Sequence, residues 1–285
     1  MNAYGKSITE SLLGSVFGRP RLTACVNTLK ATADELISEL AESGVRAEKS
    51  ELDANALLLE DTGSIESLKA YKNGLFYIQD MASQLCVRAL APKPGETVID
   101  VCSAPGGKSF TAARLMNNSG RIFSFDIYEH KLGLINSGAK RLGIDIIKTA
   151  VRDAEKDLDF NIEADRVLCD VPCSGLGILG RKPEIRYKKD LLDSELPLLQ
   201  YRILENSARL VRKGGVLVYS TCTLNPDENI NNVNRFLSSH KEFEPLALDL
   251  GVERLIDEPD NALTLFPHFH PTDGFFISAF RRISL

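Results

Sequence analysis

The sequence predicts an α/β protein in which a small α+β module precedes a mostly parallel sheet covered by helices on both faces. Two observations predict this class: strand-like and helix-like segments mix up to about residue 75, and from Met81 onward strand, loop and helix alternate repeatedly. Such alternation is typical of parallel sheets whose two faces are buried. At 285 residues, the chain is long enough for a large core and two domains.

The N-terminal module is predicted from four segments. Residues 21–29 alternate like a strand, and residues 32–43 carry apolar side chains at helical spacing, with Thr32 as the N-cap, Glu35 three residues later and Gly44 as the stop. Residues 54–59 form a second strand candidate and residues 64–69 a short helix. We therefore expect a small domain over residues 1–75 and a second domain over residues 76–285.

The second domain is predicted as a series of alternating elements. Its helices are expected at residues 81–90, from about 108 to 116, and at 129–141, 191–211 and 227–237. Its strands are expected at residues 97–101, 121–125, 145–150, 166–169, 215–220 and 274–280. The pattern does not fix the order of these strands in the sheet.

Composition excludes several classes of protein. A hydrophobic content of 44% and a charged content of 26% are those of an ordinary globular protein. No apolar stretch approaches the ~20 residues of a membrane span, and the first residues lack the apolar core of a secretory signal. We therefore expect a cytoplasmic protein whose thiols stay reduced.

Neither a metal site nor a strongly basic surface is predicted. The six cysteines form no Cys-x-x-Cys pair, and the four histidines complete no zinc ligand set. The net charge of −5 argues against a nucleic-acid-binding protein, whose binding face is usually basic. The exception is the segment from Arg181 to Lys189, which carries five positive charges and one negative charge. Such a run is usually a solvated face, but this one begins eight residues after Cys173.

Two cysteines are the candidate catalytic groups. Cys173 lies in Asp170-Val171-Pro172-Cys173-Ser174-Gly175, and Cys222 lies in Ser220-Thr221-Cys222-Thr223-Leu224. Each follows a predicted buried strand, and parallel strands deliver the residues at their carboxyl ends to the ligand crevice. Two thiols at one crevice indicate covalent chemistry in which one attacks and the other assists. The alternative is a buried structural cysteine, which we expect for Cys25, Cys86 and Cys169.

A glycine-containing loop is the candidate cofactor site. Residues 100–109 join a strand to a helix, fit neither Gly-x-Gly-x-x-Gly nor a P-loop, and by themselves indicate no more than a tight turn. Asp126 ends the next strand, where a carboxylate can bind a ribose diol or cap a helix. Asp153 follows the third strand and can accept from an adenine amine or start a turn. A ribose-binding acid without a dinucleotide loop favours S-adenosylmethionine over NAD.

These motifs resemble the RNA cytosine carbon-5 methyltransferase family of the Sun/Fmu type. The resemblance runs from about residue 21 to the end and is carried by residues 76–84, 100–108, 170–177, 220–225 and 273–276. It implies a class I S-adenosylmethionine-dependent fold, with a Rossmann-like seven-stranded sheet whose last strand is antiparallel. It makes Cys222 the nucleophile, and Cys173 the thiol that assists release, while Asp170 is placed to hydrogen-bond the cytosine ring. It places the cofactor on Cys102, Ser103, Ala104, Pro105, Gly106, Gly107, Lys108, Asp126, Asp153 and Asp170.

The resemblance also implies an RNA partner and no metal or membrane. Residues before about 75 are expected to bind RNA, with 16S rRNA favoured over tRNA, as free RNA or in a ribosomal particle, and the protein is expected to be a monomer. Lys108 is expected to stabilise the Cys222 thiolate or to bind the RNA backbone. Phosphate contacts are expected from Arg181, Lys182, Arg186, Lys188 and Lys189, with Tyr187 available for stacking.

Three other interpretations stay open, and one departure from the family is evident. The enzyme could act on tRNA, the chain could be a non-catalytic RNA-binding or ribosome-assembly protein, or it could be a small-molecule methyltransferase or dehydrogenase. The last interpretation does not explain paired cysteines beside a basic segment. Bacterial ribosomal members carry a helical domain of the antitermination-factor type before the matching part. Only about twenty residues precede it here, so we expect a shorter member or a chain without its front.

Overall fold

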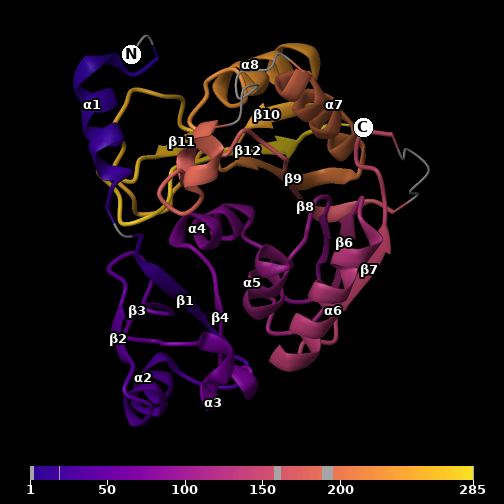
Figure 1. Cartoon of the computed structure of the whole chain (residues 1–285). Coiled ribbons are helices and arrows are strands. Elements are labelled where there is room, and N and C mark those ends of the chain that lie inside the picture. Colours follow the sequence, from indigo (N-terminus) through magenta and orange to yellow (C-terminus); the bar gives the residue numbers. More distant parts are fainter. Residues whose placement is uncertain (1–2, 19, 157–161, 188–194, 285) are drawn as a thin grey trace.

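The computed structural model describes residues 3–18, 20–156, 162–187 and 195–284 (Figure 1). Two members of the predicted basic segment, Lys188 and Lys189, lie outside these residues, as does the start of the helix predicted at 191–211. None of the described helices combines the length and the apolar character needed to cross a membrane. The described residues also contain no group of three or more His, Cys, Asp or Glu side chains able to hold a metal ion.

The N-terminal part contains a small four-stranded antiparallel sheet with helices beside it, and its first helix lies against the second part of the chain, where Tyr4 Oη donates to the Leu224 carbonyl oxygen at 2.8 Å. Its elements are α1 (Gly5–Ser15), β1 (Leu22–Val26), α2 (Ala33–Glu42), β2 (Arg46–Lys49), β3 (Ala56–Glu60), η1 (Ile65–Ser67), α3 (Lys69–Lys72) and β4 (Phe76–Ile78). The strand order is β2-β3-β1-β4. The predicted cap of α2 is confirmed: Thr32 Oγ1 accepts from Glu35 N, and Thr32 N donates to the Glu35 carboxylate. Leu36, Leu40, Leu57 and Phe76 are fully buried in the core of this unit.

The second part is a larger sheet with helices on both faces (Figure 1). Its helices are α4 (Met81–Leu90), α5 (Gly107–Leu115), α6 (Glu129–Leu142), η2 (Leu176–Ile178), η3 (Pro183–Tyr187), α7 (Glu195–Arg209) and α8 (Ile230–Ser239). Its strands are β5 (Thr97–Asp100), β6 (Arg121–Asp126), β7 (Ile147–Val151), β8 (Ala164–Asp170), β9 (Val211–Thr221), β10 (Phe243–Pro245), β11 (Ala262–Leu265) and β12 (Phe275–Arg282). The predicted class, an α/β sheet after a small α+β domain, is confirmed.

The main path of the large sheet runs β10-β12-β9-β8-β5-β6-β7, and among the described residues an eighth strand, β11, pairs with β12 beside this path. The strands from β5 to β9 are parallel to one another. The last strand, β12, is antiparallel to β9, as the resemblance implied. Both faces are buried: Val216 and Val218 of β9 pack into one core cluster, and Leu217 and Tyr219 into the other.

The sheet order creates a crevice between β5 and β8. The chain leaves β5 toward β6 on one side and leaves β8 toward β9 on the other, so the loops after β5 and β8 diverge. Ligands of open α/β sheets bind at such a point, beyond the carboxyl ends of the strands. β4 pairs with β1 in the small sheet and leads directly into α4 of the second part. The domain boundary between residues 75 and 76 stays a prediction.

Candidate active site

Two cysteine thiols meet at the carboxyl edge of the large sheet. Cys173 lies in the loop after β8, and Cys222 directly follows β9. Because β8 and β9 are parallel neighbours, their ends bring both side chains to one place, and the two Sγ atoms are 3.2 Å apart. Both thiols are half-buried, whereas Cys25, Cys86 and Cys169 are buried, as expected.

The surroundings make the two thiols chemically different. A hydrogen bond from Cys173 is the main cause that lowers the pKa of the Cys222 thiol; the cations of Lys108 and Lys182 add to it, against burial and Asp170. The same hydrogen bond, together with burial, raises the pKa of Cys173 well above its ordinary value. Since the thiolate is the nucleophilic form, Cys222 is the member of the pair suited to attack.

An ion pair joins the first turn of α5 to the end of β8. Lys108 Nζ donates to Asp170 Oδ2 at 2.7 Å, and Ser220 Oγ donates to Asp170 Oδ1 at 2.7 Å. Burial lowers the pKa of Lys108, but attraction to Asp170 and neighbouring acids outweighs it and raises the pKa above its ordinary value. Lys108 Nζ also lies 5.3 Å from the centre of the Phe275 ring. A cation and a carboxylate therefore stand beside the thiol pair.

A close backbone contact fixes the Cys222 segment. Gly177 N donates to the Cys222 carbonyl oxygen at 3.0 Å, and Gly274 N donates to the Gly177 carbonyl oxygen at 2.9 Å. A Cβ on Gly177 would lie 2.0 Å from the Gly274 oxygen, so a side chain does not fit. The loop containing Cys173, the segment containing Cys222 and the start of β12 are therefore held together through their backbones.

The loop between β5 and α5 lines a cavity of about 220 Å³. Gly106 has a φ of +112°, which favours glycine, and a Cβ there would lie 2.6 Å from the Phe110 ring. Asp100 lines the cavity and is 1% exposed, and its Oδ1 has no hydrogen-bond partner among the described residues. Burial raises the pKa of Asp100 to about 7. The predicted loop residues that also line the cavity are Cys102, Ser103, Ala104, Pro105, Gly107 and Lys108, together with Asp170.

Gln79 lines the same cavity and was not among the predicted site residues. Its Oε1 accepts from Thr111 Oγ1 at 2.6 Å, which leaves Nε2 buried and without a partner in the described part of the chain. Gln79 lies in segment 76–84, which carries part of the family resemblance. Membership in that segment is the sequence signal that could have identified Gln79 as a site residue. Gln79 Nε2 and Asp100 Oδ1 give the cavity one unpaired donor and one unpaired acceptor.

The two acids predicted to bind ribose and adenine lie at the same edge of the sheet but do not line this cavity. Asp126 ends β6, and its Oδ1 accepts from Tyr128 N at 3.0 Å. Asp153 follows β7, and its Oδ1 accepts from Glu155 N at 3.0 Å. Asp153 therefore makes the local turn contact that was its alternative interpretation, whereas Asp126 is not the N-cap of α6, a position that Tyr128 occupies. The role of both acids toward a cofactor stays a prediction.

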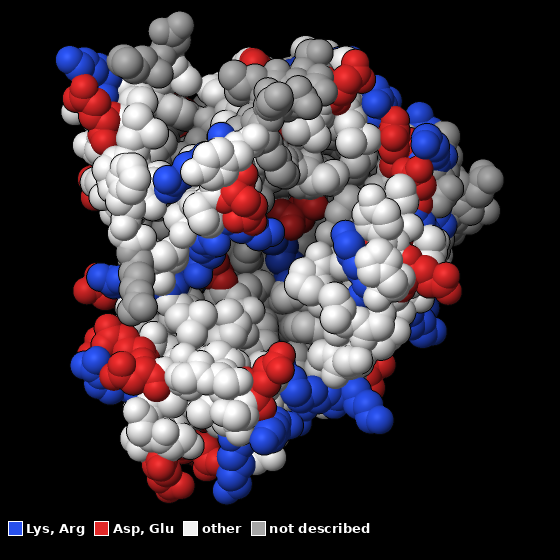
Figure 2. Space-filling model, in the orientation of Figure 1, with Lys and Arg blue, Asp and Glu red and all other residues white. Residues whose placement is uncertain are grey.

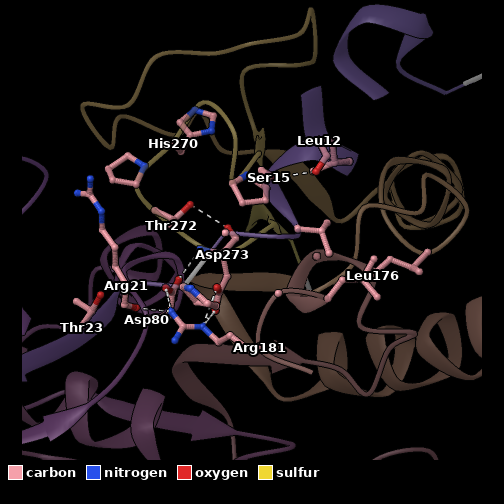
Figure 3. A pocket seen from close by; sticks show the side chains of 18 residues that line it. Leu12, Ser15, Arg21, Thr23, Asp80, Leu176, Arg181, His270, Thr272 and Asp273 are labelled. Atoms are coloured by element: carbon pink, nitrogen blue, oxygen red, sulfur yellow. Dashed lines mark hydrogen bonds and ion pairs between the residues drawn. The ribbon is translucent and has the colours of Figure 1, made fainter. Parts of the chain in front are cut away.

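Arg181 is not the free phosphate-binding cation that the sequence predicted. Its guanidinium donates to Asp273 at 2.6 Å and to Asp80 at 3.0 Å, and it also donates to the carbonyl oxygen of Arg21 (Figure 3). Two carboxylates already neutralise this cation, so it joins the loop after β8 to β4, β12 and the start of β1. The charge count of the segment alone could not reveal these partners.

The other described members of the basic segment are more available. The Arg186 guanidinium lies 5.2 Å from the Phe17 ring, and Tyr187 is 85% exposed. A second cavity, of about 180 Å³, lies between α1, the 176–181 loop and the 267–273 loop, and Figure 3 shows Arg21 and Asp80 at its border. Asp80 lines both cavities. Figure 2 shows a hollow at the centre of this face, with Lys and Arg atoms gathered around it.

Comparison with known families assigns both parts of the chain. The family model for 16S rRNA methyltransferase RsmB/F matches residues 87–281. A second model, for the ferredoxin-like domain of RsmF/B-like methyltransferases, matches residues 1–66. Together the two matches cover the large sheet and most of the small one.

Individual relatives agree with these matches. The chain is 41% identical over 290 residues to the probable ribosomal RNA small subunit methyltransferase B of Bacillus subtilis, which covers 99% of this chain and 64% of the relative. It is 35% identical over 221 residues to the tRNA (cytosine(72)-C(5))-methyltransferase of Pyrococcus horikoshii, which covers 77% of this chain and 56% of that protein. The crystal structure of NSun6 from P. horikoshii with SFG superposes with a TM-score of 0.88 at 25% identity, over 100% of this chain and 96% of that one. The chain thus spans less than two thirds of the length of these two sequence relatives.

Proposed function

The chain belongs to the RsmB/F family of 16S rRNA methyltransferases, and from this premise we propose that it methylates carbon 5 of a cytosine in RNA through a covalent cysteine adduct at carbon 6. The membership confirms the resemblance predicted from the motifs. The observation that carries the mechanism is the 3.2 Å contact between Cys173 and Cys222 beside the Lys108–Asp170 ion pair.

The family depends on S-adenosylmethionine, and the site fits this cofactor. The unpaired Asp100 Oδ1 can accept from its ammonium group, and the loop from Cys102 to Lys108 offers a backbone cradle at the N-terminus of α5. We assign the remaining contacts to Asp126, Asp153 and Asp170. When bound, S-adenosylmethionine supplies an electrophilic methyl group.

Cys222 is the proposed nucleophile. Carbon 5 of cytosine is too weak a nucleophile to take a methyl group unaided, so the Cys222 thiolate adds to carbon 6 and its electron pair shifts the ring electrons toward carbon 5. We assign to Asp170 hydrogen bonds to the ring nitrogen and amino group as charge develops. Carbon 5 then gains the methyl group, and the adduct contains a carbon–sulfur bond to the enzyme.

Cys173 is the proposed group for release. Carbon 5 must lose its proton, to Cys173 or to a water that Cys173 positions, before the carbon–sulfur bond breaks and the ring regains its aromaticity. The 3.2 Å contact between its Sγ and that of Cys222 supports this assignment. A non-catalytic binding protein needs no second thiol at this position, which argues against that alternative.

The RNA substrate is proposed from the relatives and from the surface. The target base must leave its stack to expose carbon 6. Contacts to the RNA backbone are assigned to Lys182, Arg186 and the small N-terminal sheet, and Figure 2 shows Lys and Arg atoms gathered around a hollow on this face. The B. subtilis relative favours 16S rRNA, free or in a ribosomal particle, whereas the P. horikoshii relative makes tRNA the second candidate.

Methyl transfer from labelled S-adenosylmethionine to unmodified bacterial 16S rRNA and tRNA tests this proposal. We expect label in 5-methylcytidine with the wild-type protein and with Cys25→Ala, a buried cysteine in β1 of the small sheet. We expect none with Cys222→Ala. Full transfer by Cys222→Ala would overturn the assignment of the nucleophile, and tight cofactor binding without label on either RNA would overturn the activity.

A further inference from the structure

A buried carboxylate lies behind the two catalytic loops. Glu228 is 1% exposed and accepts four hydrogen bonds, and among the described residues none of the ion pairs involves it. Its Oε1 accepts from Ser174 Oγ at 2.6 Å and from Asn225 Nδ2 at 3.1 Å. Its Oε2 accepts from Ser174 N at 2.9 Å and from Gln200 Nε2 at 2.8 Å. All four donors are neutral groups.

Burying a carboxylate in this way is costly. A charge removed from water must recover its lost hydration from hydrogen bonds, and a well-packed apolar residue of similar size would avoid the penalty. Hydrogen bonds to charged groups are stronger than those between neutral groups, so four of them can hold the carboxylate in place. Such bonds are also short and directional, which fixes the positions of the donors.

The four bonds converge on the neighbours of the two cysteines. Ser174 directly follows Cys173, and Ser174 Oγ lies 2.7 Å from Thr223 Oγ1, in the residue directly after Cys222. Gln200 Nε2, which donates to Glu228, also donates to the carbonyl oxygen of Pro172 at 3.0 Å. The residues before and after Cys173, and the residue after Cys222, are therefore all tied to one carboxylate within two hydrogen bonds.

We propose that Glu228 is a positioning residue that holds the Cys173 and Cys222 thiols in contact through Ser174 and Thr223. Glu228 reaches neither sulfur itself, and it acts by fixing the two loops that carry them. The catalytic consequence rests on the proposed function, since the thiol contact matters for methyl transfer only if Cys222 attacks the base. The geometric consequence does not, because the spacing of the sulfurs is a property of the free protein.

The Glu228→Gln variant tests this role with little change in volume. Whichever way the amide is oriented, its NH₂ group faces two of the four donors, so the contacts of one oxygen are lost. Glu258→Gln is the matched control, because Glu258 is also a buried carboxylate, accepts from Thr264 N and Oγ1, and lies in the segment between β10 and β11.

Two measurements on the free protein report thiol geometry. The first is the rate of cross-linking by dibromobimane, which becomes fluorescent after both of its arms have alkylated thiols, with Cys173→Ser as the blank. The second is the pH profile of Cys222 alkylation by iodoacetamide, followed by peptide mass spectrometry. For Glu228→Gln we expect cross-linking about tenfold slower and an alkylation profile moved to higher pH, with both unchanged in Glu258→Gln.

Methyl transfer then separates positioning from binding. We expect kcat of Glu228→Gln to fall at least tenfold with the KM for S-adenosylmethionine unchanged, and Glu228→Asp to recover part of the loss. A folded Glu228→Gln protein with wild-type cross-linking and alkylation would overturn the proposal, as would equal losses in Glu258→Gln. If the wild-type protein methylates no RNA, the proposed function fails, while the two thiol measurements still decide the role of Glu228.

Discussion

Lys108 Nζ lies 2.7 Å from Asp170 Oδ2, and the two groups act on the Cys222 thiol in opposite directions. The cation favours the thiolate and the carboxylate opposes it. The ion pair joins the first turn of α5 to the end of β8, across the crevice of the sheet. The cation of Lys108 therefore offsets the effect of the Asp170 carboxylate on the ionisation of the Cys222 thiol.

Lys108→Met should raise the pKa of Cys222, because it removes a cation and leaves Asp170 uncompensated. We expect the alkylation rate of Cys222 at pH 7 to fall several-fold and methyl transfer to fall about 100-fold. Removing one partner of a fully buried pair costs about 3–5 kcal/mol, and these partly exposed side chains should cost less. The pH profile of iodoacetamide alkylation measures the effect, with Lys182→Met as the control for a more weakly acting cation. Identical profiles for wild type and Lys108→Met would refute this role.

Cys173→Ala should separate bond formation from release. We expect the variant to form the RNA adduct and transfer one methyl group, then to remain bound to the RNA, because the group that assists proton loss is missing. A denaturing gel with labelled RNA would show a slowly migrating protein–RNA band. The same gel should lack that band for Cys222→Ala, which cannot form the adduct. Rapid multiple turnover by Cys173→Ala would contradict the assignment.

Much of the site could be predicted from the sequence because it depends on strand ends. Cys173 and Cys222 follow buried strands, and parallel pairing of β8 and β9 then suffices to bring them together. The bounds of α4 were predicted because its start and end signals are local: Asp80 caps the first turn and Pro92 follows the last. Such local signals can be recognised in the sequence without knowledge of the tertiary structure.

The elements that escaped prediction lack such signals. The helix α1 was not predicted, although Ile8, Leu12 and Val16 recur every four residues; it has no buried residue and no side-chain N-cap. The strands β2 and β10 are four and three residues long and mostly exposed, which leaves no alternation to detect. The strands β4 and β11 were also not predicted; both are short, at three and four residues.

The polar residues that escaped prediction have distant partners. Arg181 and Asp80 are 101 positions apart in the chain, and Glu228 and Ser174 are 54 apart. Nothing in either local segment specifies such a pairing. The same distance explains why the sequence predicts a phosphate ligand at Arg181: its neighbours in sequence are cations, whereas its neighbours in space are carboxylates.

Gly177→Ala should unfold or strongly weaken the protein. The new Cβ would meet the Gly274 oxygen at 2.0 Å and the Cys222 oxygen at 2.9 Å, and both are backbone atoms that cannot move aside. We expect a loss of more than about 3 kcal/mol in the free energy of unfolding, at the upper end for a single substitution. Gly133→Ala is the control: it lies in α6 with no atom within 4 Å, and alanine should add about 0.5–1 kcal/mol there. Urea titration compares the two, and equal midpoints would show that the backbone contact at Gly177 is not a close one.

Asp100→Asn should remove one component of the dependence of stability on pH. Burial raises the pKa of Asp100 from an ordinary value of 3.8 to about 7, so between these values the folded protein binds a proton that the unfolded chain has released. The free energy of unfolding therefore falls as pH rises from about 4 to about 7, by an amount on the order of 4 kcal/mol at most. The asparagine side chain at position 100 does not titrate. The contributions of the other titratable groups to the pH dependence cancel when the variant is compared with wild type. Urea unfolding of both proteins at pH 4.5, 6 and 8 should show wild type losing stability relative to Asp100→Asn across this range. A difference that stays constant with pH would mean that Asp100 is ionised throughout and that its Oδ1 has a partner in solution.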